Sequence, residues 1–231
     1  MTGLRKAIKH KGAPNMSIEH DVIITDPHSH AHEEHVHRDD EASKMGIWLF
    51  LFTEVLLFGG LFILYASYRF LHPDDFKNAA AELNVYIGSL NTIILLASSL
   101  TVVLAIISLQ KNMKKLCLSF LWFTIICGIA FLVNKYFEWG HKIEHGIYPK
   151  GPAMADMSDG EVLFFGLYYV MTGLHALHII IGMIFIGFIM VFIMKDKVTA
   201  TNFQKLENAG LYWHLVDVIW IFLFPLFYLI H

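Results

Sequence analysis

The chain has 231 residues, of which 56% are hydrophobic and 16% charged, with a mean hydropathy of +0.53 and a net charge of −3 at pH 7. This composition is too apolar for an ordinary soluble domain, and no basic run forms the footprint of a nucleic-acid-binding protein. The charged residues crowd the first 44 positions and a few short loops, which is typical of a multi-pass membrane protein with a soluble N-terminal segment.

The N-terminal segment is rich in histidine. It contains the stretch HDVIITDPHSHAHEEHVHRDDE, whose histidines include His28, His30, His32, His35 and His37. Such tracts bind Zn²⁺ or Cu²⁺ in some proteins, so these five are weak metal candidates, and no other metal site is expected. The favoured interpretation is a solvated, flexible tail over residues 1–44. Residues 45–231 are then a separate membrane domain.

Five segments are long and apolar enough to cross a bilayer as helices. They are approximately 46–70, 84–110, 115–139, 161–194 and 209–230. The period-two alternation of transmembrane β-strands is absent. The expected fold class is therefore an all-α membrane protein, a bundle of five transmembrane helices with a flexible soluble N-terminal tail.

The distribution of Lys and Arg predicts the orientation of this bundle. Twelve of these residues lie in the tail and in the two loops on its side of the membrane, and five lie on the opposite side. Basic residues favour the cytoplasmic side. We therefore expect a cytoplasmic N-terminus and, with an odd number of spans, a C-terminus outside.

The first span contains a single ionisable residue near its middle, Glu54. At a rise of 1.5 Å per residue it lies roughly 13 Å into the helix, close to the centre of the bilayer. Its helical neighbours Phe50 and Phe58 offer no polar partner, so a partner must come from another helix, water or lipid. Burial without a cation favours the neutral acid. We expect Glu54 to be protonated at neutral pH and to face Asn91 of the second span.

Polar residues in the second and third spans favour contacts between helices. Asn91 lies on a stripe of small and amide side chains, which permits close helix approach and interhelical hydrogen bonds. Glu138 lies near the outer end of the third span, between Lys135 and Lys142. It is expected to pair with Lys142 or with a histidine of the next span.

The fourth and fifth spans carry further polar side chains. His175 and His178 form a His-x-x-His pair, but the HExxH glutamate is missing and no third metal ligand is assured. Hydrogen bonding or lipid contact is the favoured interpretation. In the fifth span, His214 lies three residues before Asp217 and follows Trp213. The two can bond locally, although Asp217 is expected to reach another helix.

Five motifs in order resemble subunit III of the haem-copper oxidases, from about Met45 to the C-terminus. They are WLFLFTEVLLFGG, SLNTIILLASS, YFEWG, YYVMTGLHALHIIIG and YWHLVDVIWIFLFPLFY. The family's seven-helix form holds lipids in a cleft between a two-helix and a five-helix bundle. This chain is similar to the five-helix part alone, as in some bacterial oxidases. Another subunit or lipid is then expected to cover the side of the missing helices.

The resemblance implies a non-catalytic subunit of an oxidoreductase and translocase, a cytochrome c or quinol oxidase of the bacterial cytoplasmic membrane. Haem and copper are expected in partner subunits I and II, and no cofactor but phospholipid on this chain. A subunit IV or a supercomplex is a further possible partner, and nucleic acid is not. The implied roles are holding lipid near the oxygen route, sustaining proton uptake and protecting the active site during turnover.

The resemblance places family residues on six positions of this chain: Glu54, His175, His178, Trp213, His214 and Asp217. Two other functions stay open. One is an accessory subunit of a nitric oxide reductase. The other is a standalone proton-coupled or metal transporter, in which Glu54 and the histidines form the path. The electron donor, quinol or cytochrome c, binds other subunits and is not determined by this sequence.

Overall fold

The protein is helical throughout the part that its computed structural model describes, residues 27–148, 151–155 and 157–230, with side chains from Lys44 onward. Residues 1–39 and 40–231 form two separate units, and the transmembrane helices belong to the second. The helices are α1 (Pro27–Leu71), α2 (Pro73–Ala81), α3 (Val85–Gln110), α4 (Lys114–Glu144), the 3₁₀ turn η1 (Pro152–Ala155), α5 (Asp159–Met194) and α6 (Gln204–Tyr228). This confirms the expected all-α class.

The expected N-terminal tail lies largely outside the described residues. The backbone of residues 27–43 belongs to α1, but the side chains of this part, including the five candidate histidines, are outside the description. The flexibility of the tail and its metal binding therefore stay predictions.

Five helices are long and apolar enough to cross a membrane, as expected: the part of α1 from Lys44 to Leu71, and α3, α4, α5 and α6. Apart from α1, which begins at Pro27, the helices that extend furthest beyond the predicted apolar segments are α4 and α6. α4 continues to Glu144, and α6 begins at Gln204. Hydropathy marks only the hydrocarbon layer, whereas helical hydrogen bonding continues through the polar interface.

The short helix α2 was not predicted from the sequence, because nine residues are too few to show a convincing period. Pro73 occupies its first turn, where the missing N–H costs nothing. Phe76, Ala79 and Ala80 are buried. Phe76 contacts Tyr65 of α1 and Phe164 of α5, so α2 closes one end of the bundle.

The helices pack closely where one of them carries glycine. A Cβ on Gly88 of α3 would lie 2.8 Å from the Phe224 ring of α6, and one on Gly182 of α5 would lie 2.9 Å from the Trp213 ring. Membrane helices gain little from the hydrophobic effect against lipid, so such close approaches carry much of their association. The glycines thereby fix how α3, α5 and α6 face each other.

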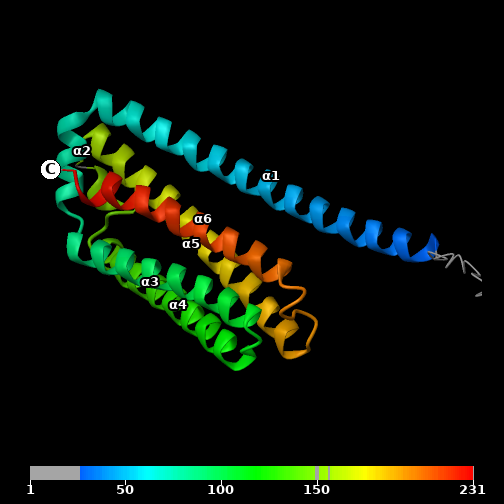
Figure 1. The fold of residues 1–231 in the computed structure, drawn as a ribbon. Coiled ribbons are helices and arrows are strands. Elements are labelled where there is room, and N and C mark those ends of the chain that lie inside the picture. Colours follow the sequence, from blue (N-terminus) through cyan, green and yellow to red (C-terminus); the bar gives the residue numbers. More distant parts are fainter. Residues whose placement is uncertain (1–26, 149–150, 156, 231) are drawn as a thin grey trace, which may run out of the picture. The chain divides into compact units, whose positions relative to one another are not determined.

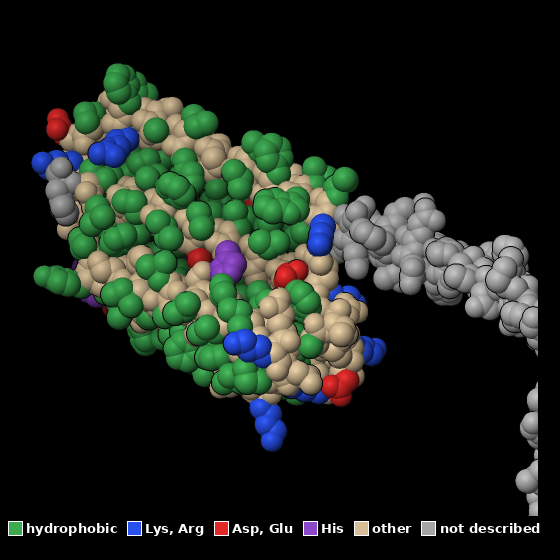
Figure 2. Space-filling view, viewed as in Figure 1, with side chains coloured by type: hydrophobic (Ala, Val, Ile, Leu, Met, Phe, Trp, Pro, Cys, Tyr) green, Lys and Arg blue, Asp and Glu red, His purple; other side chains and the backbone are tan. Residues whose placement is uncertain are grey.

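Helix α1 meets the rest of the bundle through large aromatic side chains. Phe58 packs edge-on against His178 of α5, at a ring-centroid distance of 5.3 Å, and Tyr65 packs against Phe227 of α6 at 5.1 Å. The part of α1 from Lys44 to Leu71 lies on one side of α5 and α6, and the α3–α4 pair lies on the other (Figure 1). Hydrophobic side chains cover most of the face in Figure 2, and most charged side chains lie toward its ends, as a bilayer requires.

Candidate buried polar sites

Glu54 of α1 pairs with His178 of α5. A carboxyl oxygen of Glu54 lies 2.8 Å from Nε2 of His178, and Nδ1 of His178 lies 2.7 Å from the Leu174 carbonyl oxygen. The side chains are 14% and 8% exposed. The partner comes from another helix, as expected, but the sequence-based choice of Asn91 was wrong.

The hydrogen bonds of His178 limit the charge of this pair. The Leu174 carbonyl can only accept, so Nδ1 carries a hydrogen. Nε2 then either accepts the proton of a neutral Glu54 or donates one to its carboxylate. In both forms the pair has zero net charge, which avoids the cost of an isolated charge in the membrane. A protonated Glu54 corresponds to the first form and stays a prediction.

Aromatic side chains pack against the His178 side of this pair. Phe58 is fully buried beside His178, and the Tyr212 hydroxyl donates to the His178 carbonyl at 3.2 Å. Phe50 stacks on Tyr212 at a centroid distance of 5.9 Å. Phe58, one turn after Glu54, thus packs directly on the histidine of the pair, whereas Phe50, one turn before Glu54, packs on Tyr212.

Asn91 joins a different pair of helices. Its side-chain oxygen accepts a hydrogen bond of 2.8 Å from Asn134 of α4. Asn91 is fully buried, and its own amide nitrogen has no hydrogen-bond partner among the described side chains and backbone. The contact is interhelical, as the small-residue stripe predicted, but it connects α3 with α4 and not with α1.

Glu138 lies in a buried cluster that joins α4, α5 and α6. Its carboxylate accepts hydrogen bonds from Lys135 at 3.0 Å, from the Tyr168 hydroxyl at 2.7 Å and from the Tyr228 hydroxyl at 2.5 Å. The predicted partner Lys142 instead reaches the Glu82 carbonyl at 3.5 Å. The pairing with Lys142 or a histidine was therefore wrong, since Lys135 one turn earlier points into the bundle.

His175 lies within the core, and neither of its ring nitrogens has a hydrogen-bond partner in the part of the chain that the structure describes. It is fully buried, stacks on Trp220 at a centroid distance of 5.3 Å and meets Phe131 edge-on at 5.5 Å. His178 points instead to Glu54, so the His-x-x-His spacing brings the two rings to different surroundings. Within the described part of the chain, no three His, Cys, Asp or Glu residues gather as metal ligands do.

The polar residues of α6 face α3. Trp213 Nε1 donates to the Ser98 hydroxyl at 3.0 Å, and His214 Nδ1 lies 2.7 Å from the Ser99 hydroxyl. Asp217 is buried beside Ser99 of α3, but neither of its side-chain oxygens has a hydrogen-bond partner among the described residues. The local His214–Asp217 bond is thus absent, and the helix that Asp217 approaches is α3.

Comparison with known proteins defines the class of protein to which this bundle belongs. The family model "Cytochrome c oxidase subunit III" matches residues 15–231. The chain therefore belongs to the subunit III family of the haem-copper oxidases, which confirms the resemblance drawn from the motifs.

Three relatives illustrate the range of this family. Cytochrome c oxidase subunit 3 of Alkalihalophilus pseudofirmus is 31% identical over 86% of this chain and 92% of the relative. Cytochrome bo(3) ubiquinol oxidase subunit 3 of Pseudomonas aeruginosa is 28% identical over 89% of this chain and 94% of the relative. Heme-copper oxidase subunit I+III of Aeropyrum pernix is 30% identical over 81% of this chain, but over 22% of the longer relative. Cytochrome c and quinol oxidases thus both occur among the similar proteins.

Proposed function

We propose that this chain is the accessory subunit III of a respiratory terminal oxidase that reduces O₂ to water and pumps protons. The match to the family over residues 15–231 carries this proposal. In it, the chain holds no redox centre, and haem and copper belong to subunits I and II. Its contribution is to stabilise subunit I, to bind lipid and to support proton and oxygen access.

A direct contact with subunit I is part of the proposal. The Aeropyrum pernix relative is named as subunits I and III combined, so there the two are parts of one chain. Fusion requires that both parts occupy the same complex in that organism. We extend this neighbourhood to the present chain, in the cytoplasmic membrane of a bacterium, with the N-terminus in the cytoplasm.

The Glu54–His178 pair is the proposed support for proton uptake. It holds an exchangeable proton in a bond of 2.8 Å between α1 and α5, within the span. Because the pair is neutral in both of its forms, a proton can shift between carboxyl and imidazole without a net charge in the membrane. The pair can therefore support proton uptake without a redox group of its own.

Purification of the tagged chain from its native membrane tests the assignment to an oxidase. The expected result is co-purification of a haem-bearing subunit I with an absorbance spectrum of haem and with oxygen consumption. The substrate used, reduced cytochrome c or quinol, then identifies the electron donor. Isolation of the chain alone, with transport activity in vesicles, would contradict the proposal in favour of a transporter.

Glu54→Gln tests the role of the pair. The glutamine amide nitrogen can still donate a hydrogen bond to His178 Nε2 while Nδ1 donates to Leu174, so the assembled complex should keep its subunits and its haem spectrum. Without the titratable carboxyl, proton uptake should slow and activity should decay faster during turnover. A complex that assembles and turns over like wild type shows that Glu54 has no part in proton uptake.

A further inference from the structure

Two exposed histidines lie one turn apart at the C-terminal end of α4. His141 is in the last turn of the helix, and His145 is its C-terminal cap. Residues at i and i+4 lie one above the other on a helix, and here the two imidazole rings stack with their centroids 4.4 Å apart and their planes at 29°. The rings of His175 and His178, at i and i+3, instead point to different surroundings. The end of α4 therefore brings two potential metal ligands together at an exposed position.

The hydrogen bond of His145 leaves its other ring nitrogen available for a metal ion. Nδ1 of His145 lies 2.7 Å from the His141 carbonyl oxygen, which can only accept, so Nδ1 carries a hydrogen. In the neutral ring the lone pair is then on Nε2. Metal-binding histidines commonly donate their second N–H to a backbone carbonyl, which fixes the tautomer and the orientation of the ring. Imidazole nitrogens bind Zn²⁺ at about 2.0–2.1 Å, so two rings this close can share one ion.

The charges around the two histidines favour a cation. The C-terminal end of a helix carries a partial negative charge, and the exposed Glu144 lies three residues after His141 on the same side of α4. Lys142, the nearest lysine in sequence, is buried and points to the Glu82 carbonyl and the Phe165 ring. Within the described part of the chain, neither imidazole forms an ion pair with an acid.

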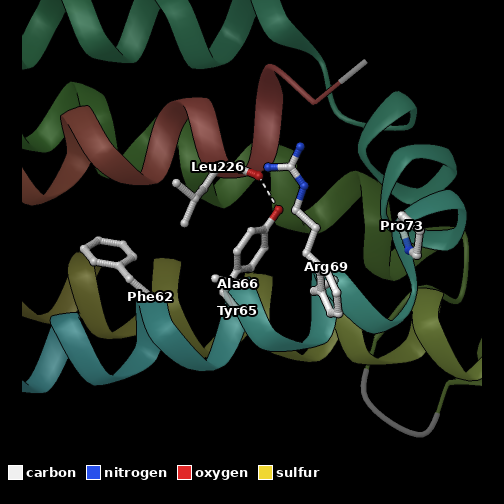
Figure 3. Close-up of a pocket in the computed structure, with 7 residues that line it drawn as sticks. Phe62, Tyr65, Ala66, Arg69, Pro73 and Leu226 are labelled. Atoms are coloured by element: carbon white, nitrogen blue, oxygen red, sulfur yellow. Dashed lines mark hydrogen bonds between the residues drawn. The ribbon is translucent and has the colours of Figure 1, made fainter.

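Open space beside α4 leaves room for the water ligands of such an ion. A hollow of ≈ 780 Å³ runs along this end of the helix, with His141 and Glu144 in its lining. A Cβ on Gly140 would meet none of the described atoms within 4 Å. The hollow beside α1 and α6 in Figure 3 is different, because its described lining contains Arg69 but no His, Cys, Asp or Glu. That hollow offers no metal ligand.

We propose that His141 and His145 bind one divalent transition-metal ion, Zn²⁺ or Cu²⁺, through one ring nitrogen each, with water in the remaining positions. Imidazole suits these two ions, whereas Mg²⁺ prefers oxygen ligands. Two protein ligands are fewer than a resident zinc centre has, so the ion is exchangeable and is not a cofactor. From the sequence, no metal site was expected outside the N-terminal segment. The inference goes beyond the proposed function and does not depend on it.

Protection from diethyl pyrocarbonate tests the proposal on the purified complex, isolated without a histidine tag. The reagent modifies neutral imidazole nitrogens, and peptide mass spectrometry reports each histidine separately, so the N-terminal histidines do not interfere. At a Zn²⁺ concentration about ten times the dissociation constant, modification of His141 and His145 should slow roughly tenfold, because about a tenth of the sites is free. Mg²⁺ should not protect. In His145→Ala, half-protection of His141 should require at least about ten times more Zn²⁺, since the loss of a residue that merely orients a ligand already costs that much.

A variant with one histidine moved off the shared side of the helix is the matched control. His145→Ala combined with Ile143→His keeps two histidines near the end of α4, but residues at i and i+2 do not face each other. Ile143 is 51% exposed, so the helix can accommodate a histidine there. This variant should bind Zn²⁺ no better than His145→Ala alone. Haem content and the presence of subunit I, measured on the same samples, show whether each variant complex is assembled.

Three outcomes overturn the proposal. The first is equal modification of His141 and His145 in wild type with and without Zn²⁺, which needs no variant to interpret. The second is equal protection by Mg²⁺, which would indicate a general effect of charge. The third is full protection in the variant with the displaced histidine, which would show that the pairing is not needed. None of them bears on the assignment to an oxidase, which the haem spectrum and subunit I test separately.

Discussion

Replacing Lys135 with methionine should strongly destabilise the bundle. The Lys135 and Glu138 side chains are 3% and 5% exposed, so solvent does not screen them. Lys135 Nζ donates to Glu138 at 3.0 Å, to Tyr168 at 3.1 Å and to Tyr228 at 2.8 Å. Methionine keeps the unbranched shape but leaves the carboxylate uncompensated, at a cost of about 3–5 kcal/mol. That corresponds to a melting temperature lower by roughly 6–20 °C for a chain of this size.

A double-mutant cycle separates this pairing from simple packing. Glu138→Gln should also destabilise, because it leaves the ammonium group buried. The double variant Lys135→Met with Glu138→Gln removes both charges and should lose less than the sum of the single variants, with a coupling of about 2 kcal/mol or more. Unfolding of the purified chain in lipid–detergent micelles by increasing dodecyl sulfate gives each free energy.

The control is Lys115→Met, an exposed lysine at the start of the same helix, which should change stability by less than about 0.5 kcal/mol. The reasoning is refuted if Lys135→Met costs less than about 1 kcal/mol, the value of an ordinary neutral hydrogen bond. It is equally refuted if the double variant is less stable than the sum of the two single losses.

Three further predictions use the same structure. Gly182→Ala places a Cβ 2.9 Å from the buried Trp213 ring and should lower the free energy of unfolding by about 1–3 kcal/mol. Gly187→Ala, with no neighbour within 4 Å, should leave stability unchanged or raise it by up to about 1 kcal/mol. Unfolding in dodecyl sulfate compares the two variants, and equal effects would contradict the close packing at Gly182. Tyr65→Phe removes the hydroxyl that donates to the Leu226 carbonyl and should cost about 0.5–1.5 kcal/mol, with faster amide hydrogen exchange at the end of α6; unchanged exchange there would argue against the bond. An apolar carbodiimide should modify Glu54 at neutral pH, because this reagent requires a protonated carboxyl group. Peptide mass spectrometry should detect the adduct in wild type and none in Glu54→Gln. An unmodified wild type would favour the carboxylate form of the pair.

The spans and the family could be predicted from the sequence because both depend on local patterns. A long apolar run excludes every structure except a helix when it lies in lipid, so hydropathy alone locates five spans. The motifs that resemble subunit III are likewise contiguous. α2 was missed because it is short and because the burial of Phe76 depends on ring contacts with α1 and α5, which its own nine residues do not reveal.

The partners of the polar residues could not be predicted in the same way. In a membrane helix both the buried and the lipid-facing sides are apolar, so the hydrophobic pattern does not fix its rotation. The sequence therefore indicated that Glu54 needs a partner on another helix but chose Asn91, and it paired Glu138 with the wrong lysine.

By itself, the sequence determined that this chain is a five-span membrane protein of the subunit III family with costly polar groups inside its spans. Only the tertiary structure decided which of those groups meet: Glu54 with His178, and Glu138 with Lys135. The physical reason is that helix rotation follows from close contacts such as those at Gly88 and Gly182, which join residues far apart along the chain.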